Sequence, residues 1–262
     1  MRAARPRGGV WSPSEEAVVV EDLSYTYPSP TGRGRSPRPA LDGASLTVRS
    51  GSITGLVGVN GAGKSTIFKA LMGIVEPDSG RTRILGQPPR VARRAGLVGY
   101  VPQAEEIDDT FPLTVRDVVS MGRYGRLGTT RRLGRTDRVA VDAAIEQVQL
   151  SELADRQIGR LSGGQRRRVF VARSLCQEAQ VLLLDEPFAG VDRRSEALVV
   201  SVLRDLVARG GAVLVSTHDL VALPSLADHV VLVHHTVLAA GTAEAVLTPE
   251  NLARAFGGEE PR

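Results

Sequence analysis

A glycine-rich segment constrains the fold of this 262-residue chain more than any other feature: Gly58-Val59-Asn60-Gly61-Ala62-Gly63-Lys64-Ser65. The apolar run at 51–58 is typical of a buried strand, and residues 66–72 carry the apolar spacing of a helix. A glycine loop between a strand and a helix is the context in which such a segment binds phosphate. The segment therefore predicts a nucleoside triphosphate site at a strand–helix junction.

The residue types of this loop suit phosphate chemistry. The three glycines let the backbone curl until several N–H groups point at phosphate oxygens, with Asn60 and Ala62 between them and Thr66 just after the loop. The N-terminus of the following helix adds partial positive charge. Lys64 supplies a full charge toward the terminal phosphates, and Ser65 supplies a hydroxyl for magnesium. A purely structural glycine turn would not require this lysine, which is one of only two in the chain.

Two further apolar strands are predicted to end in polar residues at one edge of the sheet. The run 181–184 is followed by Asp185 and Glu186, and the run 212–216 leads to His218. The carboxyl ends of parallel strands carry the ligand sites of α/β sheets. We therefore expect Asp185 to hold magnesium, Glu186 to orient or deprotonate the attacking water, and His218 to reach the γ-phosphate. The remaining histidines have no cysteine or carboxylate at metal-binding spacing, so we expect structural positions for them: His229, His234 and His235.

A second helix start, at residues 161–165, has the sequence Leu-Ser-Gly-Gly-Gln. Ser162 is a favourable N-cap, Gly163 and Gly164 permit close backbone approach, and residues from Gln165 to Leu175 are typical of a helix. Taken alone, this pattern is compatible with an ordinary capped helix. One nucleotide needs only one phosphate-binding loop, however, so the second one suggests a surface that completes the site of another molecule.

Together these segments resemble the nucleotide-binding subunits of ATP-binding-cassette (ABC) transporters over nearly all of residues 17–257. The matching motifs are the Walker A loop at 58–65, Gln103 after Val101-Pro102, the signature at 161–165, the Walker B strand ending in Asp185-Glu186, Gly190-Val191-Asp192, and His218. The resemblance implies the P-loop NTPase fold of an ABC nucleotide-binding domain. This α/β fold has a mainly parallel sheet core, an antiparallel β subdomain and a helical subdomain at about 104–168.

The same resemblance implies roles for single residues, with ATP and Mg²⁺ as cofactors. Gln103 would contact magnesium or the attacking water, and it would respond to the state of the membrane partner. The signature residues 162–165 would contact the γ-phosphate of ATP held by the opposite subunit of a head-to-tail homodimer, and Asp192 would link the two sites. An aromatic side chain near the N-terminus should stack on adenine. Tyr27 aligns best with that position, and Tyr25 is the alternative.

The residues at 101–125 and 185–192 resemble the manganese, zinc and iron(II) importer branch of this family. That resemblance implies a peripheral subunit at the cytoplasmic face of the cell membrane, bound to integral membrane permease subunits, with an extracytoplasmic substrate-binding protein in the full system. The cargo would be a divalent metal ion or a metal chelate, and Phe111 and Arg123 would lie where the permease docks. The alternatives are a siderophore or haem importer, an exporter, or a non-transport ATPase that acts as a clamp on nucleic acid.

The segments outside these motifs indicate the domain boundaries and the type of compartment. No run approaches the ~18 apolar residues of a membrane span, and the Arg-, Pro- and Gly-rich residues 1–16 lack the apolar core of a secretory signal. We expect a flexible leader at 1–16, a basic loop at 28–39 and a tail at 258–262. Apolar spacing predicts two helices in the helical subdomain, Val115–Met121 and Asp137–Val148. A single cysteine, Cys176, fits a reducing compartment.

Charge gives a weaker indication of partners. The net charge is +4, and six arginines lie between residues 123 and 138. They could attract anionic lipid or the permease, but arginine is abundant throughout the chain, which favours a solvated, arginine-rich surface. Nucleic-acid binding would require aromatic residues for stacking beside the basic ones. Tyr124 is the one aromatic residue in this stretch, so no direct nucleic-acid contact is expected.

Overall fold

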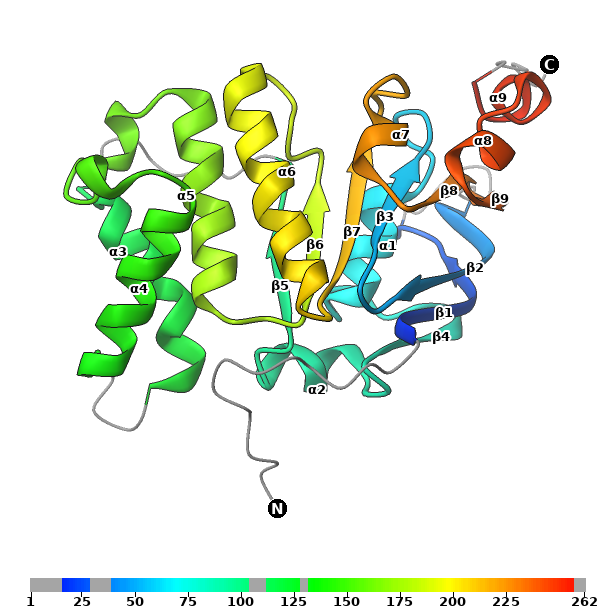
Figure 1. The fold of residues 1–262 in the computed structure, drawn as a ribbon. Coiled ribbons are helices and arrows are strands. Elements are labelled where there is room, and N and C mark those ends of the chain that lie inside the picture. Colours follow the sequence, from blue (N-terminus) through cyan, green and yellow to red (C-terminus); the bar gives the residue numbers. More distant parts are fainter. Residues whose placement is uncertain (1–15, 29–38, 104–111, 128–131, 257–262) are drawn as a thin grey trace.

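Two β-sheets organise the molecule (Figure 1). The structure, a computed structural model, describes residues 16–28, 39–103, 112–127 and 132–256. In this part of the chain the larger sheet has six strands, of which the first five in spatial order are parallel and the last is antiparallel. These strands are β5 (Val98–Val101), β6 (Val181–Asp185), β7 (Ala212–Thr217), β3 (Ile53–Val57), β8 (His229–His234) and β9 (Thr236–Gly241).

The smaller sheet is antiparallel, with β1 paired to a strand on each side. Its strands, in spatial order, are β2 (Leu41–Arg49), β1 (Glu16–Tyr25) and β4 (Ser79–Ile84). The predicted combination of a mainly parallel core and an antiparallel β subdomain is therefore confirmed. Several predicted segments lie wholly or mostly outside the described residues: the leader, the basic loop at 28–39, Phe111 and the tail.

Helices pack on both faces of the larger sheet and also form a group beside it (Figure 1). None of the helices in the described part of the chain combines the length and the apolar character that a membrane-spanning segment needs. The α-helices are α1 (Lys64–Leu71), α2 (Pro89–Arg94), α3 (Val115–Ser120), α4 (Arg135–Gln147), α5 (Gly163–Cys176), α6 (Arg193–Ala208), α7 (Leu223–Leu226), α8 (Ala243–Val246) and α9 (Pro249–Phe256). The 3₁₀ helices are η1 (Met121–Arg126), η2 (Ser151–Leu153) and η3 (Ile158–Arg160).

The central strands are apolar along their whole length because both of their faces are covered. On β6, Leu182 and Leu184 belong to the core cluster that also contains Leu203 of α6. The alternate residue Leu183 belongs to a second cluster with Phe68 of α1. Successive side chains of a strand point to opposite faces, so α6 and α1 lie on opposite sides of β6. Helix α1, which follows the phosphate-binding loop, is thereby fixed against the centre of the sheet.

The helical subdomain contains both predicted helices, with shifted ends. The first, predicted at Val115–Met121, is α3 followed by the 3₁₀ helix η1, so the helical path runs on to Arg126. The second, predicted at Asp137–Val148, is α4, which begins at Arg135 because Asp137 accepts a hydrogen bond from the Gly134 N–H at 3.0 Å. A carboxylate in the first turn that binds the N-cap backbone extends a helix toward its N-terminus.

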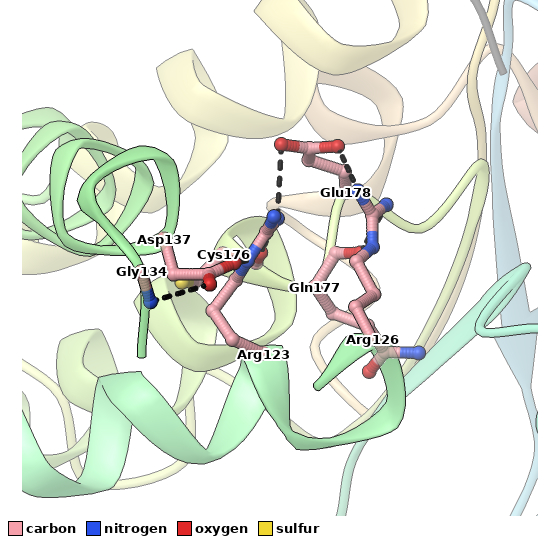
Figure 2. Close-up of polar contacts among 7 residues, drawn as sticks. All are labelled: Arg123, Arg126, Gly134, Asp137, Cys176, Gln177 and Glu178. Atoms are coloured by element: carbon pink, nitrogen blue, oxygen red, sulfur yellow. Dashed lines mark hydrogen bonds and ion pairs between the residues drawn. The ribbon is translucent and has the colours of Figure 1, made fainter. Parts of the chain in front are cut away.

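Arg123 departs from the expected solvated arginine surface. Its side chain is 9% exposed, and it joins η1 to α4 and to the end of α5 (Figure 2). The guanidinium donates to the Asp137 carboxylate at 2.9 Å, to Glu178 at 3.0 Å and to the Cys176 carbonyl oxygen at 3.2 Å. Arg126 also contacts Glu178. The prediction of a solvated surface is therefore wrong for Arg123, because its partners come from segments far away in sequence.

The carboxylate of Asp137, which is partly buried, is an ion-pair partner of the buried Arg123 guanidinium. Burial alone would raise the pKa of Asp137, but the Gly134 N–H bond and the Arg123 guanidinium outweigh burial and hold that pKa below its ordinary value of 3.8. A carboxylate with a lowered pKa in the folded state adds stability above its unfolded pKa. That stability is lost as the pH falls through the lowered pKa.

Replacing Arg123 by Met should lower the free energy of unfolding by about 3 kcal/mol at pH 7, because the substitution removes the buried guanidinium and leaves the partly buried Asp137 carboxylate without its charged partner. Urea unfolding of Arg123→Met beside Arg138→Met, an exposed arginine of α4, measures the difference. Equal midpoints for the two variants would contradict a structural role for Arg123. The Asp137 part of the difference should shrink as the pH falls below 3.8, since the carboxylate then becomes neutral.

Candidate functional site

The phosphate-binding loop joins β3 to α1, as the sequence predicts. β3 is buried along its whole length, and α1 begins at Lys64 with Gly63 as its N-cap in the left-handed region, at a φ of 101°. A Cβ on Gly63 would also stand 2.7 Å from the carbonyl oxygen of Ala40. Only glycine combines this backbone conformation with so close a neighbour. The loop thus turns sharply into the helix N-terminus, where anions are favoured.

Lys64 is buried in the loop it belongs to. Its Nζ donates to the carbonyl oxygens of Gly58 at 2.6 Å and Val59 at 3.1 Å. Burial lowers the pKa of Lys64, and the carboxylates of Glu186 and Asp185 oppose this shift. A compact ammonium held in this way is placed for the oxygens of a polyphosphate in the same pocket.

Asp185 joins the loop to the ends of two strands. β6 and β7 are parallel neighbours whose register pairs Asp185 with Ser216. The Asp185 carboxylate accepts hydrogen bonds from Ser216 Oγ at 2.5 Å and from Ser65 Oγ at 2.9 Å. A hydroxyl and a carboxylate beside a phosphate site are oxygen ligands of the type that Mg²⁺ takes together with waters and phosphate oxygens. The residues present therefore fit the magnesium site that the sequence predicts.

Glu186 lies one residue further, at the point where β6 turns away. Its φ is 47°, in the left-handed region, and its N–H donates to Ser216 Oγ at 2.9 Å. The carboxylate Oε2 accepts a hydrogen bond from Gln103 Nε2 at 3.0 Å and lies 3.4 Å from His218 Nδ1. The Glu186 side chain is buried, whereas the His218 side chain is exposed. The structure thus brings together the three residues that the sequence assigns to hydrolysis.

Ser216 is a site residue that the sequence patterns did not single out. Its hydroxyl donates to Asp185 and accepts from the Glu186 N–H, so it orders both carboxylate residues. The signal was present in the sequence, because a fully buried strand of apolar residues, 212–215, continues into a serine. A buried hydroxyl needs hydrogen-bonding partners, and the neighbouring strand end supplies them.

Two adjoining pockets contain the predicted nucleotide residues. The larger one has a volume of about 470 Å³, and a smaller one of about 250 Å³ reaches His218 and Phe256. The larger pocket is lined by Tyr27, Ala40, Asn60, Gly61, Ala62, Gly63, Lys64, Ser65, Thr66, Gln103 and Glu186. Gly58 and Val59 line the smaller one, so the pockets meet along the loop.

Tyr27 lies at the edge of the larger pocket and is 41% exposed. Its hydroxyl is 3.2 Å from Thr66 Oγ1 and accepts a hydrogen bond from Lys69 Nζ at 3.3 Å. Lys69 Nζ also lies 5.4 Å from the centre of the Tyr27 ring. Tyr25 packs edge-on against that ring, with centroids 4.9 Å apart. The geometry favours Tyr27 over Tyr25 for contact with a base, and the stacking role stays a prediction.

The signature residues lie apart from the phosphate-binding loop of the same chain. Ser162 is the N-cap of α5: its Oγ accepts from the Gln165 N–H at 3.3 Å, and Gln165 Oε1 accepts from the Ser162 N–H at 3.0 Å. This reciprocal pair is a capping box. A separate pocket of about 360 Å³ adjoins the helix start, lined by Gly163, Arg166, Arg167, Phe170, Ala189 and Gly190. Among the residues that the structure describes, this lining and that of the nucleotide pockets have no member in common.

Asp192 lies beside the signature helix and outside the nucleotide pockets. It caps α6 by accepting from the Ser195 N–H at 2.9 Å, and hydrogen bonds from Ser195 lower the pKa of its carboxyl. A Cβ built on Gly164 would stand 2.8 Å from Asp192 Oδ2. The second glycine of the signature therefore lets α5 approach the first turn of α6 closely.

The other histidines take structural positions at strand ends, as expected. His229 begins β8, and His234 ends it. His234 Nδ1 lies 3.2 Å from the Ala255 carbonyl oxygen, and His235 Nδ1 lies 3.3 Å from that of Ala40. Throughout the described ranges, no group of three or more His, Cys, Asp and Glu side chains is arranged to hold a metal ion.

Sequence comparison decides the family. Residues 41–189 match the family described as "ABC transporter", and this range contains the Walker A loop, the signature and the Walker B carboxylates. The chain belongs to the ABC transporter family. It is an ATP-hydrolysing cassette of that family, with the nucleotide as its substrate.

Curated relatives match nearly the whole cassette. It is 45% identical over 241 residues to the chelated iron transport system membrane protein YfeB of Yersinia pestis, covering 92% of this chain and 79% of the relative. It is 46% identical to the manganese transport system ATP-binding protein MntA of Synechocystis sp., covering 92% and 90%. The zinc transport system ATP-binding protein TroB of Treponema pallidum is 42% identical, with 92% and 87% covered.

Solved structures share the fold of the cassette. A metal-chelate type ABC transporter in an inward-facing conformation matches with a TM-score of 0.78 and 28% identity, covering 92% of this chain and 89% of that one. The ADP conformation of another ATP-binding cassette matches with a TM-score of 0.77 over 93% of this chain and 99% of that one. Its identity of 24% shows the fold alone.

The two signature glycines should respond differently to alanine. Gly164→Ala should lower stability by about 1 kcal/mol, because the new methyl group displaces the Asp192 side chain that caps α6. A methyl group on Gly163 would have no described atom within 4 Å, so Gly163→Ala should keep or slightly raise stability through its helix propensity. Thermal unfolding of the two variants checks this order, and a lower midpoint for Gly163→Ala would refute the assigned packing.

Proposed function

We propose that this cassette hydrolyses ATP to energise the import of a divalent metal ion or metal chelate through a separate permease. The observation that supports ATP hydrolysis is the placement of the buried Glu186 carboxylate beside the phosphate-binding loop. This carboxylate accepts a hydrogen bond from Gln103 and lies 3.4 Å from His218. The cargo part is supported by the relatives, which are named as chelated iron, manganese and zinc transport proteins.

ATP would lie along the two adjoining pockets. The loop N–H groups and the α1 N-terminus would bind the phosphates, with the Lys64 ammonium neutralising their charge. Tyr27, at the edge of the larger pocket, would stack on the adenine ring. Ser65 and Asp185 would hold Mg²⁺, with Gln103 close by. When bound, this ion neutralises charge on the phosphate oxygens.

Glu186 would act on the water that attacks the γ-phosphate. Its carboxylate would orient this water and accept its proton, while the Gln103 amide fixes the carboxylate from one side. His218 would contact the γ-phosphate from the end of the neighbouring strand. Most of the rate acceleration would come from positioning and from charge stabilisation, as phosphoryl transfer generally requires.

Two copies of the chain would be needed to complete each nucleotide site, so a dimer would hold two such sites. Gly163 of the signature lines a pocket separate from the nucleotide pockets of the same chain, which favours use of the signature by a second copy. In a head-to-tail homodimer, Ser162, Gly163 and Gly164 would contact the γ-phosphate bound by the partner. Asp192 lies next to Gly164 and would link the two sites across the interface.

The cassette would dock on integral membrane permease subunits at the cytoplasmic face of the membrane, and an extracytoplasmic substrate-binding protein would deliver the cargo. The stretch 101–125 is expected to face the permease. Within it, Arg123 is buried whereas Tyr124 is 59% exposed. We therefore assign the permease contact to the surface around Tyr124. The buried Arg123 would hold this surface in place.

Replacing Glu186 by Gln should reduce ATP turnover at least about 100-fold, because the amide cannot accept the proton of the attacking water. ATP binding should remain, and the variant should accumulate as an ATP-bound dimer. Steady-state ATPase assays, ATP titration and size-exclusion chromatography with ATP measure the three properties. Turnover equal to that of the unsubstituted protein would remove Glu186 from the proposed role.

The same variant tests the cargo in cells. In a strain deleted for this gene, the unsubstituted protein should restore the cellular content of manganese, zinc or iron, and Glu186→Gln should not. Elemental analysis of the two complemented strains identifies the metal. Unchanged metal content in the deletion strain would contradict metal import and leave the ATPase assignment standing.

Tyr27→Ala should weaken ATP binding about tenfold through the loss of base stacking, whereas Tyr25→Ala should change it by less than about threefold. Fluorescence titration with ATP and with inorganic triphosphate separates the base contact from the phosphate contacts. Triphosphate affinity should be equal in both variants. A larger effect of Tyr25→Ala on ATP would transfer the stacking role to Tyr25.

A further inference from the structure

Arg167 forms a contact that the roles described so far do not use. It lies on α5, five residues after the N-cap Ser162. Its Nη1 donates to the carbonyl oxygen of Pro102 at 2.8 Å, and its Nη2 donates to that of Gln103 at 2.8 Å. Two nitrogens of one planar guanidinium thus bind two consecutive carbonyls, which fixes both the position and the direction of this backbone segment.

The backbone that Arg167 binds carries a hydrolytic side chain. Pro102 and Gln103 follow directly after β5, which ends at Val101. From the same residue, Gln103 Nε2 donates to Glu186 Oε2 at 3.0 Å. An unbroken chain of contacts therefore runs from α5 through the main chain of Gln103 and its side-chain amide to the Glu186 carboxylate.

Helix α5 also bears the signature at its first turn. Ser162 and Gly163 stand at the helix start, and Arg167 lies about one and a half turns further along the same rigid element. Any shift of α5 that accompanies contact between the signature and a second copy's nucleotide moves Arg167 as well. The carbonyls of Pro102 and Gln103 are bound to that guanidinium, so the shift reaches the Gln103 amide.

We propose that Arg167 is a positioning residue for ATP hydrolysis. It holds Gln103 so that its amide orients the Glu186 carboxylate, and it makes this orientation depend on the position of the signature helix. The inference rests on the proposed hydrolytic role of Glu186. It adds a connection within one chain. When the signature of this chain contacts the nucleotide held by the partner, Arg167 and Gln103 position Glu186 in this chain's own nucleotide site for hydrolysis.

The geometry requires arginine at this position. Two donors with fixed spacing match two carbonyl oxygens, whereas a lysine ammonium is a single point charge on a flexible stem. The neighbouring Arg166 lines the pocket at the signature together with Arg167, but both hydrogen bonds to the carbonyls of Pro102 and Gln103 come from Arg167. The proposed role therefore belongs to Arg167.

A double-mutant cycle tests the proposal in the full-length protein. Arg167→Ala should lower kcat about tenfold while the ATP dissociation constant stays within about twofold, because Arg167 binds the Gln103 backbone and is not among the described residues that line the nucleotide pockets. In a Gln103→Ala background the same substitution should have no further effect on kcat, since Arg167 acts through Gln103. Arg167→Lys should retain an intermediate kcat. Arg138→Ala, an exposed position on α4, controls for the loss of an arginine.

Additive losses in the double variant, or a weakening of ATP binding equal to the loss of kcat, would overturn the proposal, since either result indicates a general structural role. A second measurement is independent of turnover: in the Glu186→Gln background, Arg167→Ala should still form the ATP-bound dimer. Loss of that dimer would also count against the proposal. If the unsubstituted protein hydrolyses no ATP, the proposed function fails; if it does and Arg167→Ala equals it, only the Arg167 inference fails.

Discussion

The Asp185 carboxylate is the interaction on which the rest of the site depends. Its two oxygens accept hydrogen bonds from Ser65 on α1 and Ser216 on β7, and it stands itself at the end of β6. One buried carboxylate thereby joins the phosphate-binding helix to two parallel strands. Because Ser216 also accepts a hydrogen bond from the Glu186 N–H, the same junction fixes the backbone position of Glu186, the proposed base. Hydrogen bonds of a charged group in a buried setting are strong enough to define such a geometry.

The signature helix α5 makes different contacts at three positions along its length. Its first turn, at Gly163, lines a pocket that shares no described lining residue with the nucleotide pockets of the same chain. Its second turn, at Arg167, is bound to the backbone next to β5, and its end, near Cys176, is bound by Arg123. Helix α5 is therefore bound to the backbone after β5 and to η1, in addition to carrying the signature at its first turn.

Local patterns were sufficient to predict the phosphate-binding loop, the buried strands and the cap at Ser162, because each depends on a few neighbouring residues. The contacts that could not be predicted from the sequence join residues that are far apart in the chain. Arg123 was expected in solvent, yet Glu178, 55 positions away, supplies its ion pair. Ser216 and Arg167 have partners 31 and 64 positions away, respectively. Periodicity and spacing report which face of an element is buried, but only the assembled fold decides which polar groups meet there.

The backbone of Glu186 has a consequence for how this protein can change. Its φ of 47° belongs to a region in which a glutamate is strained, at a cost of order 1–3 kcal/mol. Glycine or asparagine at this position would relax the chain and remove the carboxylate. In the proposed mechanism, such a variant would be more stable and would turn over less ATP. With Glu186 as the proposed base, stability and turnover are therefore opposed at this position.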